Sequence, residues 1–534
     1  MAKIILKKSG KNLLIILSAI ILVGGLYFWA QSQPEQPKSD VQKSEKSFFD
    51  KLFGGDDKES DDNIIKIGTN TFAGFNYLMW LNHGLEPNKD CPLFKMTGLM
   101  AKIIVQDDFP AGRAAFINDD INLLYCTVDA FPTEMSEGSE MVKAGAKYIF
   151  LSNWSRGADA IVATKRIRNV GDLVGKVVAC SQGTASHTLL LNTLEANGIG
   201  SNRVHLGEGI DKNKVNIKVV ENGLEAASTF KSGQCDAAVV YSPDDADIVS
   251  TMDAWVLVST KQASNIICDG LIAKQSYIEK NREKLEKLIA AFLTANVKMN
   301  TDEAAVKEAS KYFAKYYGTD EDFANMGTKT VYFATLGDEA NFFGLNAEYS
   351  GIKGFDLYDK MREIYSSLKL CKSPLRWDKV SDSSIIEALL NNPSMVQGDQ
   401  KAEDKRTFTP ATDAVKDAEA ISAKKVTIEF QSGSCTLDND AMTMIDREFI
   451  PIVKRFSNSR IRIEGNCDAT GSDEFNKKLS LLRAQAVRDY ICRKLNLDQN
   501  QFVAVGNGSS KAKRDGVQGD NQLYRTTDLE LIRE

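Results

Sequence analysis

Histidine and paired cysteine are scarce in this sequence. It has three histidines, and none of its nine cysteines belongs to a CxxC pair. Zinc centres and dithiol redox sites take their ligands from such clusters, so neither kind of site is expected. The sequence also contains no Walker, Ser/His/Asp or metal-ligand pattern. We therefore expect no cofactor, no bound metal and no enzymatic activity.

The chain has no excess of positive charge. Its 66 basic and 72 acidic residues give a formal net charge of -6. Binding to a phosphate backbone needs a positive field, so no nucleic-acid partner is expected. The hydrophobic share of 43% and the charged share of 26% are ordinary for globular proteins, which excludes a mostly disordered chain or a polytopic membrane protein. At about 150 residues per domain, 534 residues allow about three folded units.

One stretch near the N-terminus is free of charge for long enough to cross a membrane. Four lysines in the first 11 residues precede the uncharged run Leu13 to Ala30, which as a helix would span about 27 Å. Because lysines stay on the cytoplasmic side, we expect residues 1–30 to form a single-pass inner-membrane anchor, with the bulk of the chain in the periplasm. A cleaved signal peptide is the alternative, although Phe28 and Ala30 do not form a small-x-small cleavage site.

Two polar stretches divide the rest of the chain. Residues 31–62 and 393–424 are rich in Pro, Ser, Lys, Glu and Asp, and such segments bury too little apolar surface to fold alone. We predict that both are flexible linkers. They would flank a middle domain, residues 63–392, and connect it to a small C-terminal domain, residues 425–534.

Strand and helix patterns alternate along the middle domain. Apolar runs such as Ile64–Thr69, Val177–Cys180 and Ala237–Tyr241 alternate with helical segments, which predicts α/β layers with a mainly parallel sheet. Ligands gather at the carboxyl ends of such strands, where this sequence places small polar residues. The candidate solute-binding residues are Thr71, Phe75, Thr127, Arg156, Gly183, Thr184, Ser186, His187, Tyr241 and Ser242.

The loop after Val177–Cys180 shows how such a strand end could bind a solute. Gly183 allows a ligand to approach the backbone, and the hydroxyls of Thr184 and Ser186 lie where a new helix exposes its free N–H groups. These donors suit an anionic group, with Arg156 as a candidate second contact. A capped helix that binds no ligand is the alternative.

Three segments of the middle domain carry a family resemblance. NVGDLVGKVVACSQGTASH, ENGLEAASTFKSGQCDAAVVYSPDDADIV and LIAKQSYIEKNREKLEKLIAAFL resemble the periplasmic solute-binding proteins of the nitrate, sulfonate and taurine (NMT1-like) type. The resemblance covers about residues 63–392. It implies two lobes that close on a small anionic or zwitterionic solute, with lobe-crossing strands near Ala160–Thr164 and Cys268–Ala273. Transport would require ABC permease and ATPase subunits from other chains.

The C-terminal segment has a sharper motif. Val426–Phe430, Arg460–Glu464 and Thr527–Ile532 have strand patterns, and Ala441–Phe456 and Phe475–Leu495 have helical patterns. Together with GNCDATGSDEFN and NKKLSLLRAQAVRDYI, this segment resembles the OmpA-like peptidoglycan-binding domains. The resemblance implies that three residues bind the diaminopimelate-containing stem peptide of the cell wall. These are Asp468, Arg483 and Asn476.

The chemistry of diaminopimelate explains that residue choice. Its end carries an ammonium and a carboxylate on one carbon, so Asp468 would accept from the ammonium while Arg483 clamps the carboxylate. Asn476 would hold the loop or the ligand. A direct salt bridge between Asp468 and Arg483, without ligand, is the alternative. Where the family has two consecutive arginines, this chain has Arg525 followed by Thr526.

Together these features predict a two-lobed α/β periplasmic-binding-protein fold, a small α/β OmpA-like domain and one transmembrane helix. The predicted function is that of a membrane-anchored, peptidoglycan-attached solute-binding protein. A spacer between membrane and wall that binds no small ligand is one alternative. An enzyme is another, because the fold resembles the pyrimidine synthase of yeast-type thiamine biosynthesis, although the CCCFC segment of that family is missing here.

Overall fold

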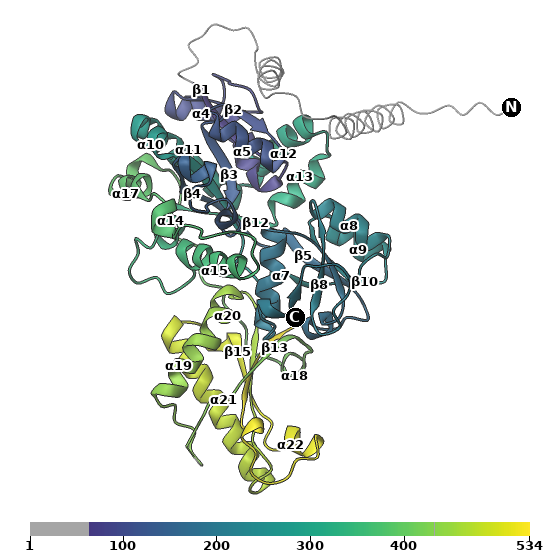
Figure 1. Cartoon of the computed structure of the whole chain (residues 1–534). Helices are drawn as coiled ribbons and strands as arrows, with labels where there is room; N and C mark the ends of the chain where they lie inside the picture. The colour runs from purple at the N-terminus through teal and green to yellow at the C-terminus, as the bar shows by residue number, and fades with distance from the viewer. Residues whose placement is uncertain (1–63, 432, 534) are drawn as a thin grey trace, which may run out of the picture. The chain divides into compact units, whose positions relative to one another are not determined.

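A computed structural model of the chain describes residues 64–431 and 433–533, which belong to one compact unit (Figure 1). The predicted anchor, residues 1–30, and the first predicted linker, residues 31–62, lie outside the described residues. Within the described part of the chain, no helix is both long enough and apolar enough to cross a bilayer.

The first lobe is built on a six-stranded sheet with the order β12-β4-β11-β3-β1-β2. Strand β1 pairs in parallel with β2 and β3, whereas β11 pairs antiparallel with β3 and β4, and β12 pairs antiparallel with β4. The strands are β1 (Ile64–Thr69), β2 (Met100–Val105), β3 (Leu123–Thr127), β4 (Ala146–Ser155), β11 (Cys268–Lys274) and β12 (Val331–Phe333).

The second lobe has its own six-stranded sheet, with the order β10-β5-β9-β6-β8-β7. Strands β6, β8, β7 and β9 are linked by parallel pairs, whereas β5 runs antiparallel to both β9 and β10. The strands are β5 (Asp159–Thr164), β6 (Val177–Ser181), β7 (Val204–His205), β8 (Val215–Val220), β9 (Ala237–Tyr241) and β10 (Ala254–Ser259).

The chain crosses between the lobes twice, and this arrangement corrects one prediction. It passes from β4 to β5 and returns from β10 to β11, which confirms crossings close to Ala160–Thr164 and Cys268–Ala273. The prediction of mainly parallel sheets was wrong, because antiparallel pairs are as frequent as parallel ones. A parallel pair of strands needs a crossover connection, which is usually a helix. Strands β5 and β11 instead enter their sheets directly from the other lobe, so they pair antiparallel with their neighbours.

Helices cover the two sheets, and α11 shows why these sequences are helical. Its buried residues Leu285, Leu288, Ile289 and Phe292 follow the spacing that places side chains on one helix face. The helices of the lobes are α3 (Asn76–Asn82), α4 (Pro92–Thr97), α5 (Phe109–Ile117), α6 (Glu140–Lys143), α7 (Ala185–Ala196), α8 (Gly223–Lys231), α9 (Asp244–Thr251), α10 (Gln275–Lys280), α11 (Arg282–Thr301), α12 (Glu303–Tyr317), α13 (Glu321–Thr328), α14 (Leu336–Phe342), α15 (Gly354–Ser367), α16 (Trp377–Val380) and α17 (Ser384–Asn391).

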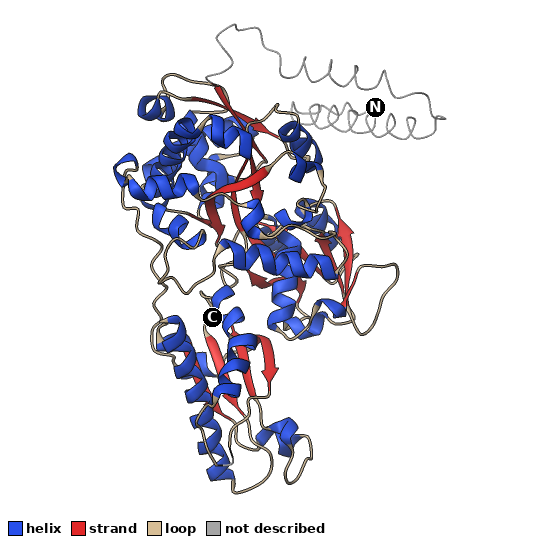
Figure 2. Cartoon of the chain, turned by 60° about the vertical axis from the view of Figure 1, so that its left-hand side comes forward, coloured by secondary structure: helices blue, strands red, loops and turns tan. Residues whose placement is uncertain are grey.

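The C-terminal domain has a four-stranded sheet with the order β13-β16-β14-β15, and Figure 2 shows its longest helix, α21, lying along these strands. Two glycines permit that close packing, because a Cβ at Gly465 would lie 2.1 Å from the Ser480 carbonyl oxygen and one at Gly506 would lie 2.4 Å from the Leu481 nitrogen. The elements are α18 (Asp413–Lys416), β13 (Ala420–Val426), α19 (Asn439–Glu448), α20 (Ile450–Arg455), β14 (Ile461–Gly465), α21 (Asp473–Leu495), β15 (Phe502–Gly506), α22 (Ser510–Arg514) and β16 (Thr527–Ile532).

Two predicted elements of this domain are corrected. A strand was predicted at Val426–Phe430, but the observed strand, β13, ends at Val426. Val426 pairs with Thr527, the first residue of β16, so β16 has no residue left to pair with the residues after Val426. The helix predicted at Ala441–Phe456 is divided into α19 and α20. Phe449 separates the two helices. The first turn of α20 contains Pro451, and proline is tolerated at the start of a helix but not in its interior.

The second predicted linker, residues 393–424, is packed against its neighbours in the structure. Three of its apolar side chains, Val396, Phe408 and Ile421, are buried. The Gln400 amide donates to the Leu293 carbonyl oxygen at 3.2 Å, and β13 begins inside the segment at Ala420. The polar composition is therefore compatible with an ordered connection, because a few well-placed apolar residues anchor it.

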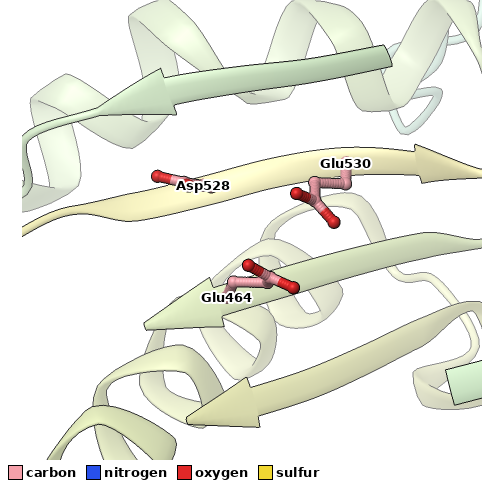
Figure 3. A group of neighbouring side chains, drawn as sticks. All are labelled: Glu464, Asp528 and Glu530. Atoms are coloured by element: carbon pink, nitrogen blue, oxygen red, sulfur yellow. The ribbon is translucent and has the colours of Figure 1, made fainter. Parts of the chain in front are cut away.

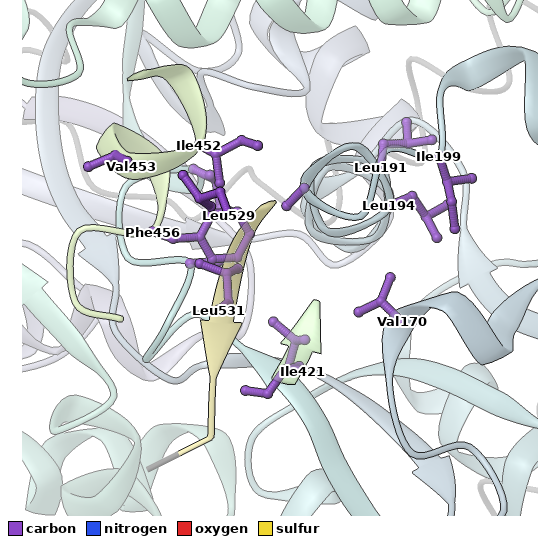
Figure 4. Packing of buried hydrophobic residues seen from close by; sticks show 14 of the residues in the cluster. Val170, Leu191, Leu194, Ile199, Ile421, Ile452, Val453, Phe456, Leu529 and Leu531 are labelled. Atoms are coloured by element: carbon purple, nitrogen blue, oxygen red, sulfur yellow. The ribbon is translucent and has the colours of Figure 1, made fainter. Parts of the chain in front are cut away.

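Helix α7 of the second lobe shares a buried core with the C-terminal domain. Leu191 and Leu194 belong to the same apolar cluster as Ile421 and Ile452 (Figure 4). Beside this cluster the Arg455 guanidinium donates to the side-chain oxygens of Asn192 and Glu195, both at 2.6 Å. The second half of α7 is thus fixed by apolar packing and by a charged contact.

All nine cysteines lie in the described residues and all are free thiols. Six of them are buried, namely Cys91, Cys126, Cys180, Cys268, Cys467 and Cys492. Burial raises the thiol pKa of Cys126, Cys180 and Cys268 above the ordinary range. These thiols are therefore protonated as well as covered, and neither condition favours reaction.

Candidate functional sites

The C-terminal domain contains a cavity of about 480 Å³ that the predicted wall-binding residues line. Asp468 lies in the loop after β14, and Asn476 and Arg483 lie two turns apart on α21. Ser472 caps this helix by accepting a hydrogen bond from the Phe475 N–H at 3.2 Å. The fold thus brings Asp468, Asn476 and Arg483 to one cavity.

Asp468 and Arg483 do not form an ion pair with each other in the structure. Asp468 accepts hydrogen bonds from the Thr470 N–H at 3.0 Å and from the Arg525 guanidinium at 2.8 Å. Arg483 donates to the Ser434 carbonyl oxygen at 3.0 Å and lies over the Phe430 ring. The alternative of a direct Asp468–Arg483 salt bridge therefore does not describe this structure.

The environment of Arg483 favours an incoming anion. Burial, reinforced by the nearby positive charge of Arg525, lowers the pKa of the Arg483 guanidinium. Among the described residues, no carboxylate forms an ion pair with Arg483, so its charge is incompletely neutralised. Because two donors in one plane match a carboxylate, this arrangement suits a carboxylate-bearing ligand.

Asn476 has a structural role in this cavity. Its amide donates to the Thr470 carbonyl oxygen at 2.7 Å and to the Ser509 hydroxyl at 2.8 Å. These bonds tie the Asp468 loop to the segment after β15. Of the two roles expected for Asn476, the structure therefore shows loop holding.

Three carboxylates on the sheet of the same domain lie close enough together to hold a metal ion. Glu464 on β14 and Asp528 and Glu530 on β16 each offer an oxygen within 4.8 Å of the others, and Figure 3 shows them on these neighbouring strands. Lys511 lies 2.6 Å from Asp528 and 3.0 Å from Glu464, and Arg462 lies 2.6 Å from Glu530. Lys511 and Arg462 already pair with all three carboxylates, so the group is explained as an ion-pair network.

Several predicted solute-binding residues meet at the start of α7. The Tyr241 side chain, at the end of β9, lies beside those of Thr184 and Ser186, and burial raises its pKa to about 12. Gly183 adopts a φ of +73°, a conformation that glycine enters without strain. Its N–H donates to His187 Nδ1 at 3.3 Å.

Ser186 and His187 are buried with donors that have no partner. Burial lowers the pKa of His187 to about 4, so the ring is neutral near pH 7. Because Nδ1 accepts the Gly183 N–H, we assign the ring proton to Nε2, which has no hydrogen-bond partner. The Ser186 hydroxyl oxygen also has none. Buried polar groups are normally satisfied, so such groups indicate a position for a ligand or water.

The other predicted solute-binding residues are engaged elsewhere or support this region. The Thr71 hydroxyl donates to Asp107 at 2.8 Å, and Phe75 packs on the Tyr125 ring with a centroid distance of 4.3 Å. The Ser242 N–H donates to the Ala158 carbonyl oxygen at 2.8 Å, which aligns the start of β5. Thr127 ends β3, two residues before the buried Asp129.

Arg156 is not available in the structure as the predicted second anion contact. Its guanidinium pairs with Glu403 at 2.6 Å and donates to the Ser264 carbonyl oxygen. It lines a separate cavity of about 350 Å³ that is also lined by residues 403–406 and 453–454. The charge of Arg156 is therefore already used within the protein.

The candidate residues chosen from the sequence do not include three acidic residues that lie near one another in the structure. Asp129 and Asp159 are buried, and Asp269 lies on β11. Burial raises the pKa of the Asp129 carboxyl to about 7 and that of Asp159 to about 6. Burial, followed by the charges of Asp159 and Asp129, raises the pKa of Asp269 well above its usual value. Their positions near strand ends were visible in the sequence, but their proximity depends on the lobe crossings.

Comparison with known families separates the same two parts of the chain. Residues 156–302 match the family described as NMT1/THI5 like, and residues 429–525 match the OmpA family. Both resemblances predicted from the sequence are thereby confirmed. The curated outer membrane porin F of Pseudomonas aeruginosa is 30% identical over 83 residues, which are 15% of this chain and 24% of the porin. The chain thus spans about a quarter of the length of that relative.

Two solved structures are similar to part of this chain. The periplasmic aliphatic sulphonate binding protein SsuA from Escherichia coli is 17% identical, with a TM-score of 0.47, and covers 61% of this chain and 99% of its own. The alkanesulfonate-binding protein SsuA from Xanthomonas axonopodis pv. citri, bound to MOPS, is 17% identical, with a TM-score of 0.43, and covers 60% and 99%.

Proposed function

We propose that this protein is a solute-binding protein of the cell envelope that is attached to peptidoglycan. Residues 63–392 capture a small anionic or zwitterionic solute, and residues 425–534 bind the diaminopimelate-containing stem peptide. The N-terminal apolar run anchors the chain in the inner membrane. ABC permease and ATPase subunits on other chains would accept the captured solute.

The observation that carries the wall-binding part is the pairing of opposite charges across one cavity. Arg483 offers a partly buried cation that lacks an anionic partner among the described residues. Asp468 accepts the Thr470 N–H at Oδ1 and the N–H groups of Arg525 and Asn521 at Oδ2, which leaves further acceptor capacity at Oδ1. A ligand end with an ammonium and a carboxylate complements both groups.

The solute-binding part is supported by the start of α7. The unpartnered donors of Ser186 and His187 are fully buried, and the helix N-terminus adds free backbone N–H groups with a positive dipole end. An anionic group of the solute would satisfy these donors.

Native mass spectrometry of the full-length protein purified from its own host tests the solute-binding part. We expect a small molecule to remain bound in the gas phase and to be released by denaturation. If the protein is consistently free of small molecules, and none of a panel of sulfonates, phosphonates and amino acids raises its melting temperature, the spacer function replaces this proposal.

A further inference from the structure

The three acidic side chains near α7 identify the chemistry of the solute more closely. This step rests on the proposed solute-binding function. We infer that the solute carries a protonated amino group, held by the carboxylates of Asp129, Asp159 and Asp269.

The lobe crossings bring these carboxylates together. Asp269 on β11 pairs in register with Thr127 on β3 and with Asn153 on β4. Asp159 opens β5, just after the first crossing, and pairs with Tyr241. Asp129 lies within electrostatic reach of both other acids and beside the Thr188 hydroxyl of α7. Two sheets and one helix thus contribute to one polar cluster.

The cluster contains buried acceptors that the protein does not satisfy. Asp129 is fully buried and lies beside the hydroxyls of Thr188 and Thr127, but neither carboxylate oxygen has a hydrogen bond of ordinary geometry. Asn153 is also fully buried, and its amide donates to the Gly74 carbonyl oxygen at 3.2 Å while its own oxygen has no partner. A buried acceptor without a donor loses its hydration and gains no hydrogen bond, so the unliganded cluster is unfavourable.

The protein also supplies no cation to this cluster. Among the ion pairs of residues 64–431 and 433–533, none includes Asp129, Asp159 or Asp269. Arg156, the nearest arginine of the crossing segment, is paired with Glu403. The positive charge that would stabilise ionised carboxylates must therefore come from the ligand, or the carboxyls must stay protonated.

An ammonium group fits these requirements. It provides several N–H donors and one positive charge, and both complement a set of carboxylate acceptors. A plain anion such as nitrate or an alkanesulfonate would place like charge beside the acids. When the solute is zwitterionic, its anionic end faces Ser186 and His187, so that donors and acceptors of the cluster are satisfied together.

Chemical labelling of the bound molecule tests the inference. The molecule is released from the full-length protein and treated by reductive methylation, which modifies amines but not hydroxyls, sulfonates or carboxylates. Its mass is measured before and after this treatment. We expect a mass increase. A bound molecule whose mass does not change would overturn the inference and leave the proposed function standing. Absence of any bound molecule would overturn both.

A variant pair locates the amine at the carboxylates. Asp129→Asn keeps the shape of the side chain and removes its charge, whereas Asp120→Asn changes an exposed aspartate of the same lobe. We expect the first variant to carry at least about tenfold less bound molecule and the second to match the wild type. If Asp129→Asn does not fold, as judged by its melting curve, Asp159→Asn takes its place. If folded Asp129→Asn and folded Asp159→Asn each carry as much bound molecule as the wild type, the assignment is wrong.

Discussion

Arg483 is a buried cation that forms no ion pair with a carboxylate of the described residues. Its guanidinium is held by a carbonyl oxygen and an aromatic face rather than by a carboxylate. Guanidinium groups inside proteins are usually paired, because desolvating the charge is costly. We therefore propose that a ligand which brings its own carboxylate accounts for its placement across a cavity from Asp468.

Removing either charged group should abolish attachment to the wall. In Asp468→Ala or Arg483→Ala, loss of a charge-assisted contact costs about 2–5 kcal/mol, which is roughly thirtyfold or more in affinity. Arg483→Lys should bind nearly as poorly, because an ammonium cannot present two parallel donors. Sedimentation of the protein with purified wall sacculi measures the effect.

A control on the same helix sharpens that experiment. Arg493 is exposed, and its Nε donates only to the Asp489 carbonyl oxygen of its own helix, at 3.2 Å. Arg493→Ala should pellet with sacculi like the wild type. If wild type, Asp468→Ala and Arg483→Ala all pellet equally, the assigned wall-binding residues are wrong.

Asp129 should make the stability of the unliganded protein depend on pH. Its carboxyl pKa rises from 3.8 to about 7 on folding, so between these values the folded state binds more protons than the unfolded state. The free energy of unfolding therefore falls as pH rises through this window, by about 4 kcal/mol in full. Asp129→Asn should lose this penalty and gain stability relative to the wild type at pH 8, but not at pH 4.

The comparison between variants removes the contribution of groups that do not interact with Asp129, and the difference includes the effect of Asp129 on Asp159 and Asp269. His187, whose pKa is lowered to about 4, contributes stability that increases with pH up to its unfolded value of 6.5. That contribution is the same in both proteins and cancels in the difference. Urea unfolding of ligand-free wild type and Asp129→Asn at several pH values measures it, and parallel profiles would contradict the raised pKa.

At the scale of elements, strand β13 links the connecting segment to the C-terminal sheet. It runs antiparallel to β16 along its whole length and buries Ile421. The connection therefore contributes to the stability of the domain that it joins. A free tether of the same composition would not.

Substitution of Ile421 tests the packing of this segment in the full chain. Ile421→Ala should lower the free energy of unfolding by about 2–5 kcal/mol, because it leaves a cavity in a buried cluster. Ala423→Ser, two residues on and exposed, should change it by less than about 0.5 kcal/mol. Equal stabilities of the two variants in chemical denaturation would show that residues 393–424 are a loose linker in solution.

The sequence predicted elements well where local signals were strong. The helix expected at Phe475–Leu495 forms as α21 because an apolar stripe and the Ser472 cap agree. At Val426–Phe430 apolar and polar residues alternate as in a strand. However, β16 begins at Thr527, which pairs with Val426, so no residue of β16 pairs with the residues after Val426. Strand pairing is a tertiary property, so a local pattern alone could not locate this strand.

The same distinction applies to the candidate sites. Asp468, Asn476 and Arg483 could be predicted to share one cavity because they belong to one local motif. Asp129 and Asp269 are far apart in the sequence, and only the crossing strands bring them together. Arg156 was expected to contact an anion, but its partner Glu403 lies 247 residues away and could not be inferred.

At the scale of the whole molecule, the membrane anchor is a prediction that rests on the sequence alone. Because lysines precede the apolar run, the C-terminus should lie outside the cytoplasm and the intact protein should stay in the inner-membrane fraction. A C-terminal alkaline phosphatase fusion should therefore be active. An inactive fusion, or a mature N-terminus near Gln31, would contradict the anchor.

The burial of six thiols has a consequence for biogenesis. A chain that crosses the membrane unfolded exposes every thiol to an oxidising compartment before the native contacts form. Folding then competes in time with disulfide formation, since the native structure contains no disulfide among its described residues and hides most of the thiols only once it is complete. The yield of native protein should thus depend on how quickly the buried cores that contain Cys126, Cys180 and Cys268 form. Slow folding would lead to incorrect disulfides as well as to aggregation.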